Sequence, residues 1–137
     1  MRYEIIDISG DIGLRAYGKC LEEAFINAGI GMYSLITDIN KVDCKTDIAL
    51  NISADSLEGL LVNYLNELIF QFDAYDFTGR KIEITGFSDN RLTAKVYGEN
   101  FDPLKHKQGL LIKAATYHNL KILKTGDIFS VDIIFDI

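Results

Sequence analysis

The chain has 137 residues, 48% of them apolar, a content and length that suit a single domain spanning residues 1–137. Its 14 basic and 20 acidic side chains give a net charge of −6, which disfavours nonspecific binding to nucleic acid because a phosphate backbone would be repelled. No segment approaches the roughly 18 uninterrupted apolar residues of a membrane span, and no signal peptide is recognisable, so we expect a soluble cytoplasmic protein without membrane attachment.

Hydrophobic periodicity predicts the following elements in chain order. Alternation with period two indicates strands, and apolar residues at spacings of three and four indicate helices. Strands are predicted at residues 3–6, 14–17 and 48–52, and helices at residues 21–37 and 56–72. Asp55 and Glu58 stand in the arrangement of a capping box at the start of the second helix.

Two hairpins complete the predicted elements. The first has arms at residues 82–84 and 92–96 around the turn "SDN", and the second has arms at 120–122 and 131–135 around "TGD". Residues 98–109, "GENFDPLKHKQG", contain the only proline and predict a long loop of the kind that is often functional. The pattern predicts an α+β two-layer sandwich, with a largely antiparallel sheet and two main helices on one face.

The segment "GLRAYGK", Gly13 to Lys19, matches the beginning of a phosphate-binding loop. However, the residues between its glycines alternate as in an extended strand, and Cys20 offers no hydroxyl for Mg²⁺. An antiparallel layout also lacks the βαβ unit to which such a loop belongs. We therefore interpret Gly18 as the end of a strand that precedes a helix.

Acidic residues near the two ends of the chain are the main candidates for function. Asp7 and Asp11 flank a predicted turn, where aspartate commonly bonds to local backbone N–H groups. Asp136 and the terminal carboxylate of Ile137 close the last strand. If the first turn and the last strand are neighbours, Asp11, Asp136 and Ile137 could hold a hard cation such as Ca²⁺; the alternative is that they are solvated strand ends.

Three basic segments each have a structural and a functional interpretation. Lys113, within "LLIKAA", either extends to solvent or pairs with a carboxylate. His118 is typical of a hydrogen-bonded structural histidine, since no nucleophile can be identified for it. "KHK", at 105–107, is typical of a solvated loop face, although it could contact a phosphate or an acidic partner.

Five segments in order resemble the archease family. These are "DISGDIGLRAYGKCLEEAF", "LLVNYLNELIFQFD", "GENFDPLKHK", "IKAATYHNL" and "VDIIFDI". The resemblance implies an accessory protein that promotes guanylylation and multiple turnover of the tRNA-splicing RNA ligase. It also implies a metal site at Asp11 and Asp136 with an oxygen of Ile137, and a functionally important lysine at Lys113.

The resemblance leaves the cation and two rival functions open. The expected cation is Ca²⁺, with Mn²⁺ or Mg²⁺ as alternatives. A rival function is a general chaperone that prevents aggregation of RNA-modifying enzymes such as a tRNA methyltransferase, and a third is a metal-dependent hydrolase using Asp7, Asp11, Asp136 and His118. The chain departs from the family pattern at Ile8, where a histidine is expected, at Ser9 and Gly10, and at Cys20, which replaces a helix-capping threonine.

Overall fold

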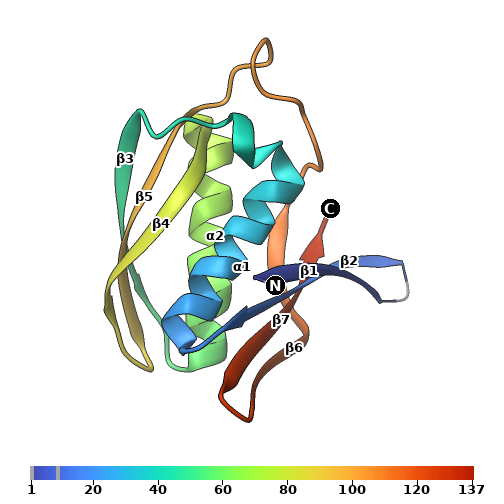
Figure 1. The fold of residues 1–137 in the computed structure, drawn as a ribbon, viewed down its shortest axis with the longest axis vertical. Coiled ribbons are helices and arrows are strands. Elements are labelled where there is room, and N and C mark those ends of the chain that lie inside the picture. The colour runs from blue at the N-terminus through green and yellow to red at the C-terminus, as the bar shows by residue number, and fades with distance from the viewer. Residues whose placement is uncertain (1, 9) are drawn as a thin grey trace.

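Two antiparallel sheets lie on either side of two helices in the computed structural model, which describes residues 2–8 and 10–137 (Figure 1). The first sheet has the strand order β1-β2-β7-β6 and the second has the order β3-β5-β4. The elements are β1 (Tyr3–Ile8), β2 (Asp11–Gly18), α1 (Leu21–Ile36), the 3₁₀ turn η1 (Ile39–Lys41), β3 (Thr46–Ser53), α2 (Leu57–Tyr75), β4 (Phe77–Phe87), β5 (Arg91–Asn100), β6 (Ala114–Thr125) and β7 (Ile128–Asp136).

The α+β class, the antiparallel pairing and the two main helices are confirmed. The strands are divided between two sheets, because the helices are apolar on more than one side and both sheets pack against them. In α1, Gly29 lies against Ile82 of the second sheet, whereas Gly31 lies against Leu14 of the first. The core is therefore the space on both sides of the helix pair, and it contains fully buried aromatic side chains such as Tyr64.

Both predicted hairpin turns are confirmed, because β4 and β5 are joined at residues 88–90 and β6 and β7 at residues 126–127. The strand interpretation of "GLRAYGK" is also confirmed, since residues 13–18 belong to β2. The predicted loop begins too early: Gly98–Asn100 extend β5, where they pair with Phe77–Gly79. The segment without helix or strand comprises residues 101–113. Within the described ranges, neither helix has the length and apolarity needed to cross a membrane.

The helix starts differ in how they are capped. The side chain of Ser56 accepts a hydrogen bond of 2.9 Å from the Gly59 N–H at the start of α2. Assigning the cap to Asp55 was therefore wrong by one residue. At α1 the N-cap residue Cys20 has the extended backbone of a cap, with φ −138° and ψ 168°, but its side chain makes no capping hydrogen bond. One N-terminal donor of α1 thus lacks the partner that a hydroxyl would provide.

We expect Cys20→Ser to raise the free energy of unfolding by about 1 kcal/mol, because serine can accept a hydrogen bond from the first turn of α1. Ser56→Ala is the matched change in the opposite direction and should lower it by about 1 kcal/mol. Urea denaturation followed by circular dichroism measures both. If Cys20→Ser has no effect while Ser56→Ala is destabilising, the first turn of α1 does not need a cap.

Candidate functional site

The pairing of β2 with β7 brings the two ends of the chain together. Ile12 lies opposite Phe135, and Arg15 lies opposite Asp132. One step further along this register, Asp11 at the start of β2 lies across from Asp136 at the end of β7. Because side chains alternate along a strand, both aspartates project from the same face as Arg15 and Asp132. The two exposed carboxylates therefore share one corner of the first sheet, which we call the acidic corner.

A bidentate ion pair fixes this register. Arg15 Nε donates to Asp132 Oδ1 at 2.7 Å, and Arg15 Nη2 donates to Oδ2 at 2.9 Å. The hydrogen bond to Asp132 raises the pKa of the Arg15 guanidinium. Asp132 is only 5% exposed, so displacement of Arg15 would leave a buried carboxylate without its cation. A slip of one residue would break this pair and turn one strand's side chains to the other face.

Lys113 borders the acidic corner through its backbone. Its N–H donates to the carbonyl oxygen of Asp136 at 2.7 Å, and the next residue, Ala114, lies opposite Asp136. The Lys113 side chain is exposed, and no ion pair joins it to a carboxylate within residues 2–8 and 10–137. Ile137 follows directly and is half-exposed. The corner thus combines two carboxylates with the main chain of Ile137 and Lys113.

Asp7 and His118 lie away from the acidic corner. Asp7 pairs with Ile12, and strand alternation therefore directs its side chain to the face opposite that of Asp11. His118 is exposed within the register shift between Thr116 and Lys121. Ala114 lies opposite Asp136 and so marks the acidic corner on β6. His118 is four residues further along this strand, which is roughly 13 Å at the usual rise. The structure therefore does not gather the four residues of the hydrolase hypothesis on one face.

The acidic corner offers hard oxygen donors, which suit Ca²⁺ and, with a smaller shell, Mn²⁺ or Mg²⁺. Across the described ranges, no group of three or more His, Cys, Asp or Glu side chains is arranged to hold a metal. Ca²⁺ takes about six to eight oxygen ligands. Asp11, Asp136 and Ile137 would therefore supply part of the shell, with the remaining oxygens coming from water or from a partner.

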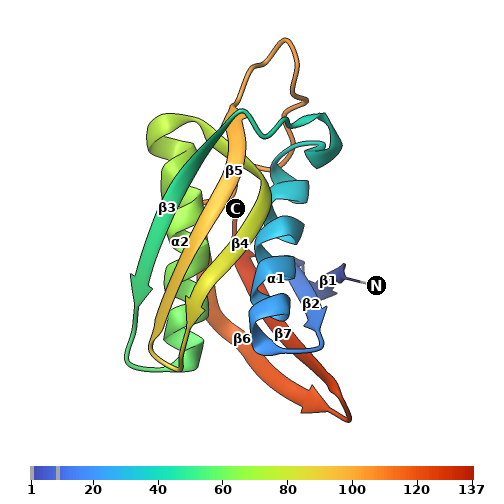
Figure 2. The same ribbon diagram turned by 60° about the vertical axis from the view of Figure 1, so that its left-hand side comes forward.

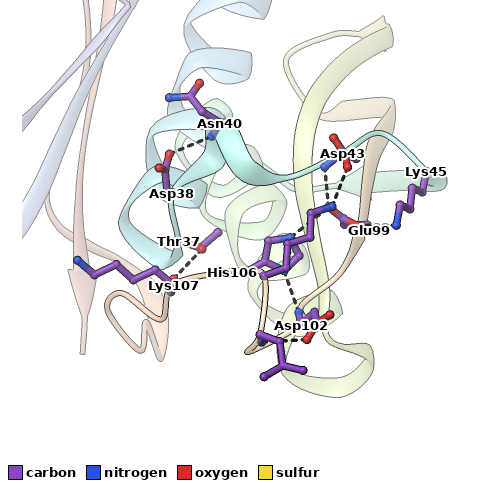
Figure 3. A network of polar contacts seen from close by, with 11 residues as sticks. Thr37, Asp38, Asn40, Asp43, Lys45, Glu99, Asp102, His106 and Lys107 are labelled. Carbon is purple, nitrogen blue, oxygen red and sulfur yellow. Dashed lines mark hydrogen bonds and ion pairs between the residues drawn. The ribbon is translucent and has the colours of Figure 1, made fainter.

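Glu99 is the centre of a second polar network, which periodicity did not reveal (Figure 3). This side chain at the end of β5 is only 5% exposed. Its Oε2 atom accepts hydrogen bonds from Lys105 Nζ at 2.7 Å and from the Asp43 N–H at 2.6 Å. Lys105 Nζ also donates to Asp43 Oδ2 at 2.7 Å. The network joins the loop at 101–113 to the segment that precedes β3.

His106 lies inside this network and is 2% exposed. Its Nδ1 accepts the Asp102 N–H at 2.8 Å, so its Nε2 carries the proton and faces Glu99 Oε2 at 3.1 Å. The ring thus links the loop backbone to the end of β5. The interpretation of "KHK" as a solvated loop face was wrong for His106, whereas Lys105 is exposed and pairs with Asp43 and Glu99. Within the loop, only Asp102–Pro103 is a sequence signal for an ordered turn. The burial of His106 also depends on Asp43, which is distant in sequence, so the loop sequence alone did not predict it.

The loop is also attached to the end of α1. Thr37 Oγ1 donates to the carbonyl oxygen of Lys107 at 2.6 Å, and Gly109 N–H donates to that of Ile36 at 2.7 Å. A Cβ at Gly109 would collide with the carbonyl oxygen of Leu35, so this close approach requires glycine. The loop therefore reaches Lys113 and the acidic corner along a fixed path.

Residues 3–137 match the archease protein family (MTH1598/TM1083). The chain belongs to the archease family. The archease of Sulfurisphaera tokodaii is 34% identical over 137 residues, which cover 99% of both chains. The archease of Pyrococcus abyssi is 38% identical over 129 residues, which cover 92% of this chain and 91% of the relative.

Two solved structures share the archease fold. The solution structure of Methanobacterium thermoautotrophicum protein 1598 has a TM-score of 0.83 at 29% identity and covers 99% of both chains. The crystal structure of an archease from Thermotoga maritima, described as a possible chaperone, has a TM-score of 0.67 at 20% identity and covers 96% of this chain and 94% of its own. Of the departures from the family pattern, Ile8 belongs to β1, Gly10 precedes β2, and Ser9 lies outside the described residues.

Glu99 should make the stability of this archease depend on pH. Burial raises its pKa, but the hydrogen bonds from Lys105, the Asp43 N–H and His106 outweigh burial and lower the pKa from 4.5 to about 2. The unfolded chain therefore binds a proton at this residue at higher pH than the folded chain does. The resulting stabilisation is present above pH 4.5 and is lost as the pH falls toward 2.

We expect Glu99→Gln to lower the free energy of unfolding near neutral pH, and the difference from wild type to shrink as the pH falls from about 5 to about 3. Urea denaturation across this range measures it. Glu83→Gln, at an exposed position on the neighbouring strand β4, is the matched control and should leave a constant difference. A difference for Glu99→Gln that did not vary with pH would contradict the role of its charge.

Proposed function

We propose that this protein is a cytoplasmic single-domain accessory protein that activates the tRNA-splicing RNA ligase, promoting its guanylylation and multiple turnover without catalysing a reaction of its own. Its membership of the archease family supports the proposal. The observation that carries it is the acidic corner, where the β2–β7 register places Asp11 across from Asp136 and the backbone of Lys113 binds the Asp136 carbonyl.

In this proposal, Asp11, Asp136 and an oxygen of Ile137 hold a divalent cation. Such a cation polarises a phosphate oxygen when it is bound. Lys113 contributes a mobile positive charge beside the two carboxylates, suited to a phosphate group in the ligase site. Arg15 and Asp132 keep the carboxylates on one face by holding β2 in register with β7.

The exposure of the acidic corner suits docking to another protein. Asp11, Lys113 and Asp136 are all exposed, and they lie at strand ends beside a loop rather than inside a cavity. A partner could therefore approach the carboxylates directly and complete the cation's shell with its own oxygens. In this arrangement the ligase supplies the nucleophile, and the archease positions the cation and a positive charge.

We expect Asp11→Asn, Asp136→Asn and Lys113→Met each to reduce guanylylation of the cognate ligase by tenfold or more, since hydrogen bonds to charged groups contribute about 1.5–3 kcal/mol. Single-turnover and multiple-turnover assays with radiolabelled GTP measure the effect. Asp89→Asn, in the exposed β4–β5 turn, is the control and should activate normally. Normal activation by all three corner variants would overturn the proposal.

Calcium titration of the isolated protein tests the cation separately from the ligase. Isothermal titration calorimetry should detect Ca²⁺ binding that is lost in Asp11→Asn and Asp136→Asn and retained in Asp89→Asn. Binding that is equal in all four proteins would place any cation elsewhere, even if ligase activation still required the acidic corner.

A second candidate function is a general chaperone for RNA-modifying enzymes such as a tRNA methyltransferase. Exposed apolar side chains on the ordered loop favour it: Leu104 is 97% exposed and Leu111 is 65% exposed. Asp102 fixes the loop beneath Leu104, because its side chain accepts the Leu104 N–H at 3.0 Å. An apolar side chain held out in this way could bind exposed apolar surface of a client protein.

If chaperone activity is the main function, Leu104→Ser should reduce protection of a heated tRNA methyltransferase, while Asp11→Asn should leave protection intact. Light scattering during thermal aggregation measures protection. Leu123→Ser, an exposed leucine on β6 outside the loop, is the matched control. If Asp11→Asn abolishes ligase activation and Leu104→Ser leaves client aggregation unchanged, the activator function is favoured.

A further inference from the structure

A cavity of about 370 Å³ lies beside α1, far along β1 from the acidic corner. Helix α1 runs between β4 and β1 (Figure 2). The cavity is lined by residues of α1 and β4 and by Arg2, which precedes β1. Its walls comprise three isoleucines, Ile26 and Ile30 of α1 and Ile82 of β4, and three cationic residues, Arg2, Arg80 and Lys81. A volume of this size is typical of sites for small molecules, which span about 300–1,000 Å³.

The charge of the cavity is opposite to that of the whole protein. The chain has a net charge of −6, yet three of the cavity-lining residues are cationic and none is acidic. Within the described part of the chain, no ion pair neutralises Arg2, Arg80 or Lys81, although Lys81 Nζ lies 5.6 Å from the centre of the Tyr97 ring. Cations gathered beside an apolar wall create a local positive potential that attracts a small anion.

Arg2 is held in place by a buried side chain. Its Nε donates to Asn27 Oδ1 at 3.1 Å, and Asn27, which is 4% exposed, donates from Nδ2 to the Tyr17 carbonyl at 2.7 Å. This anchor uses one donor of the guanidinium and leaves the terminal amino groups for another acceptor. The anchor holds Arg2 at the boundary between this cavity and a neighbouring pocket that Asn27 lines.

Arg80 is the extra residue of a β-bulge. Gly79 pairs with Gly98 and Lys81 pairs with Tyr97, so Arg80 has no partner on β5. Gly79 packs directly on the ring of Tyr33, where a Cβ would collide, and this fixes the bulge against α1. Bulges redirect side chains and are enriched beside binding sites. The bulge places two consecutive cationic residues, Arg80 and Lys81, on the wall of the cavity.

We propose that this cavity binds a mononucleotide, with its phosphate groups on Arg2, Arg80 and Lys81 and its base against the isoleucine wall. Guanidinium groups match the geometry of phosphate oxygens, and lysine adds a point charge. The net charge of −6 opposes an extended nucleic acid strand but has a smaller effect on a small anion. This inference does not depend on ligase activation or on the acidic corner.

Cys44 provides a direct readout, because it is a free, exposed thiol on the wall of the cavity. Cys20 is also free and exposed, but it lies at the start of α1 and serves as an internal control. ATP or GTP should slow alkylation of Cys44 by iodoacetamide and leave Cys20 unaffected, as followed by peptide mass spectrometry. EDTA in the buffer prevents a cation at the acidic corner from contributing.

Calorimetry with ATP, GTP and pyrophosphate gives the affinity. We expect saturable binding that weakens about tenfold or more in Arg80→Gln and in Arg2→Gln, since each loses charge-assisted hydrogen bonds. Lys95→Gln, an exposed change on β5 outside the cavity, should bind like wild type, and thermal melts should show that all variants fold. Nucleotides at millimolar concentration that protect neither thiol, or binding unchanged in both arginine variants, would overturn the proposal. Protection of Cys44 by single-stranded RNA or a polyglutamate peptide, but not by nucleotides, would also overturn it.

Discussion

The pairing of β2 with β7 is the constraint on which the acidic corner depends. Arg15 and Asp132, 117 residues apart in sequence, form two short hydrogen bonds that hold these strands in one register. Because β7 also pairs with β6, the same strand receives the N-terminal hairpin on one side and the segment after Lys113 on the other. A shift of β2 against β7 by one residue would break this salt bridge, so the salt bridge favours the one register that brings Asp11 and Asp136 together.

The Glu99 network constrains the corner from the other direction. A buried carboxylate is costly unless cations and N–H groups surround it, so Glu99 holds Lys105, His106 and the backbone of Asp43 in one arrangement. That arrangement orders a 13-residue segment without regular structure, which leads directly to Lys113. The polar contacts inside the loop therefore influence the position of a lysine that takes no part in them.

The sequence predicted what depends on local periodicity and missed what depends on distant partners. Helix α2, both hairpin turns and the strand nature of Leu14–Tyr17 follow from patterns within a few residues, and all are present. Alternation shows which face of a strand is apolar, but not which strand lies beside it. The sequence therefore predicted one sheet where the structure has two. Gly98–Asn100 had the composition of a loop, yet pairing with β4 makes them strand. His106 is buried within a network in which Lys105 also bonds to Asp43, 62 residues away.

The net charge of the whole chain does not predict the local charge at either of its two candidate sites. It argues against nonspecific binding to nucleic acid, but local geometry places two carboxylates near one end of β1 and three cationic residues beside the other. Ile8 follows Arg2 by six positions along β1, a distance of roughly 20 Å at the usual strand rise. One small ligand could not span that distance, so a cation at the acidic corner and an anion beside α1 would bind without competing. Strand β1 leads from one position to the other, and its pairing with β2 links Tyr3 to Ala16 and Ile8 to Asp11.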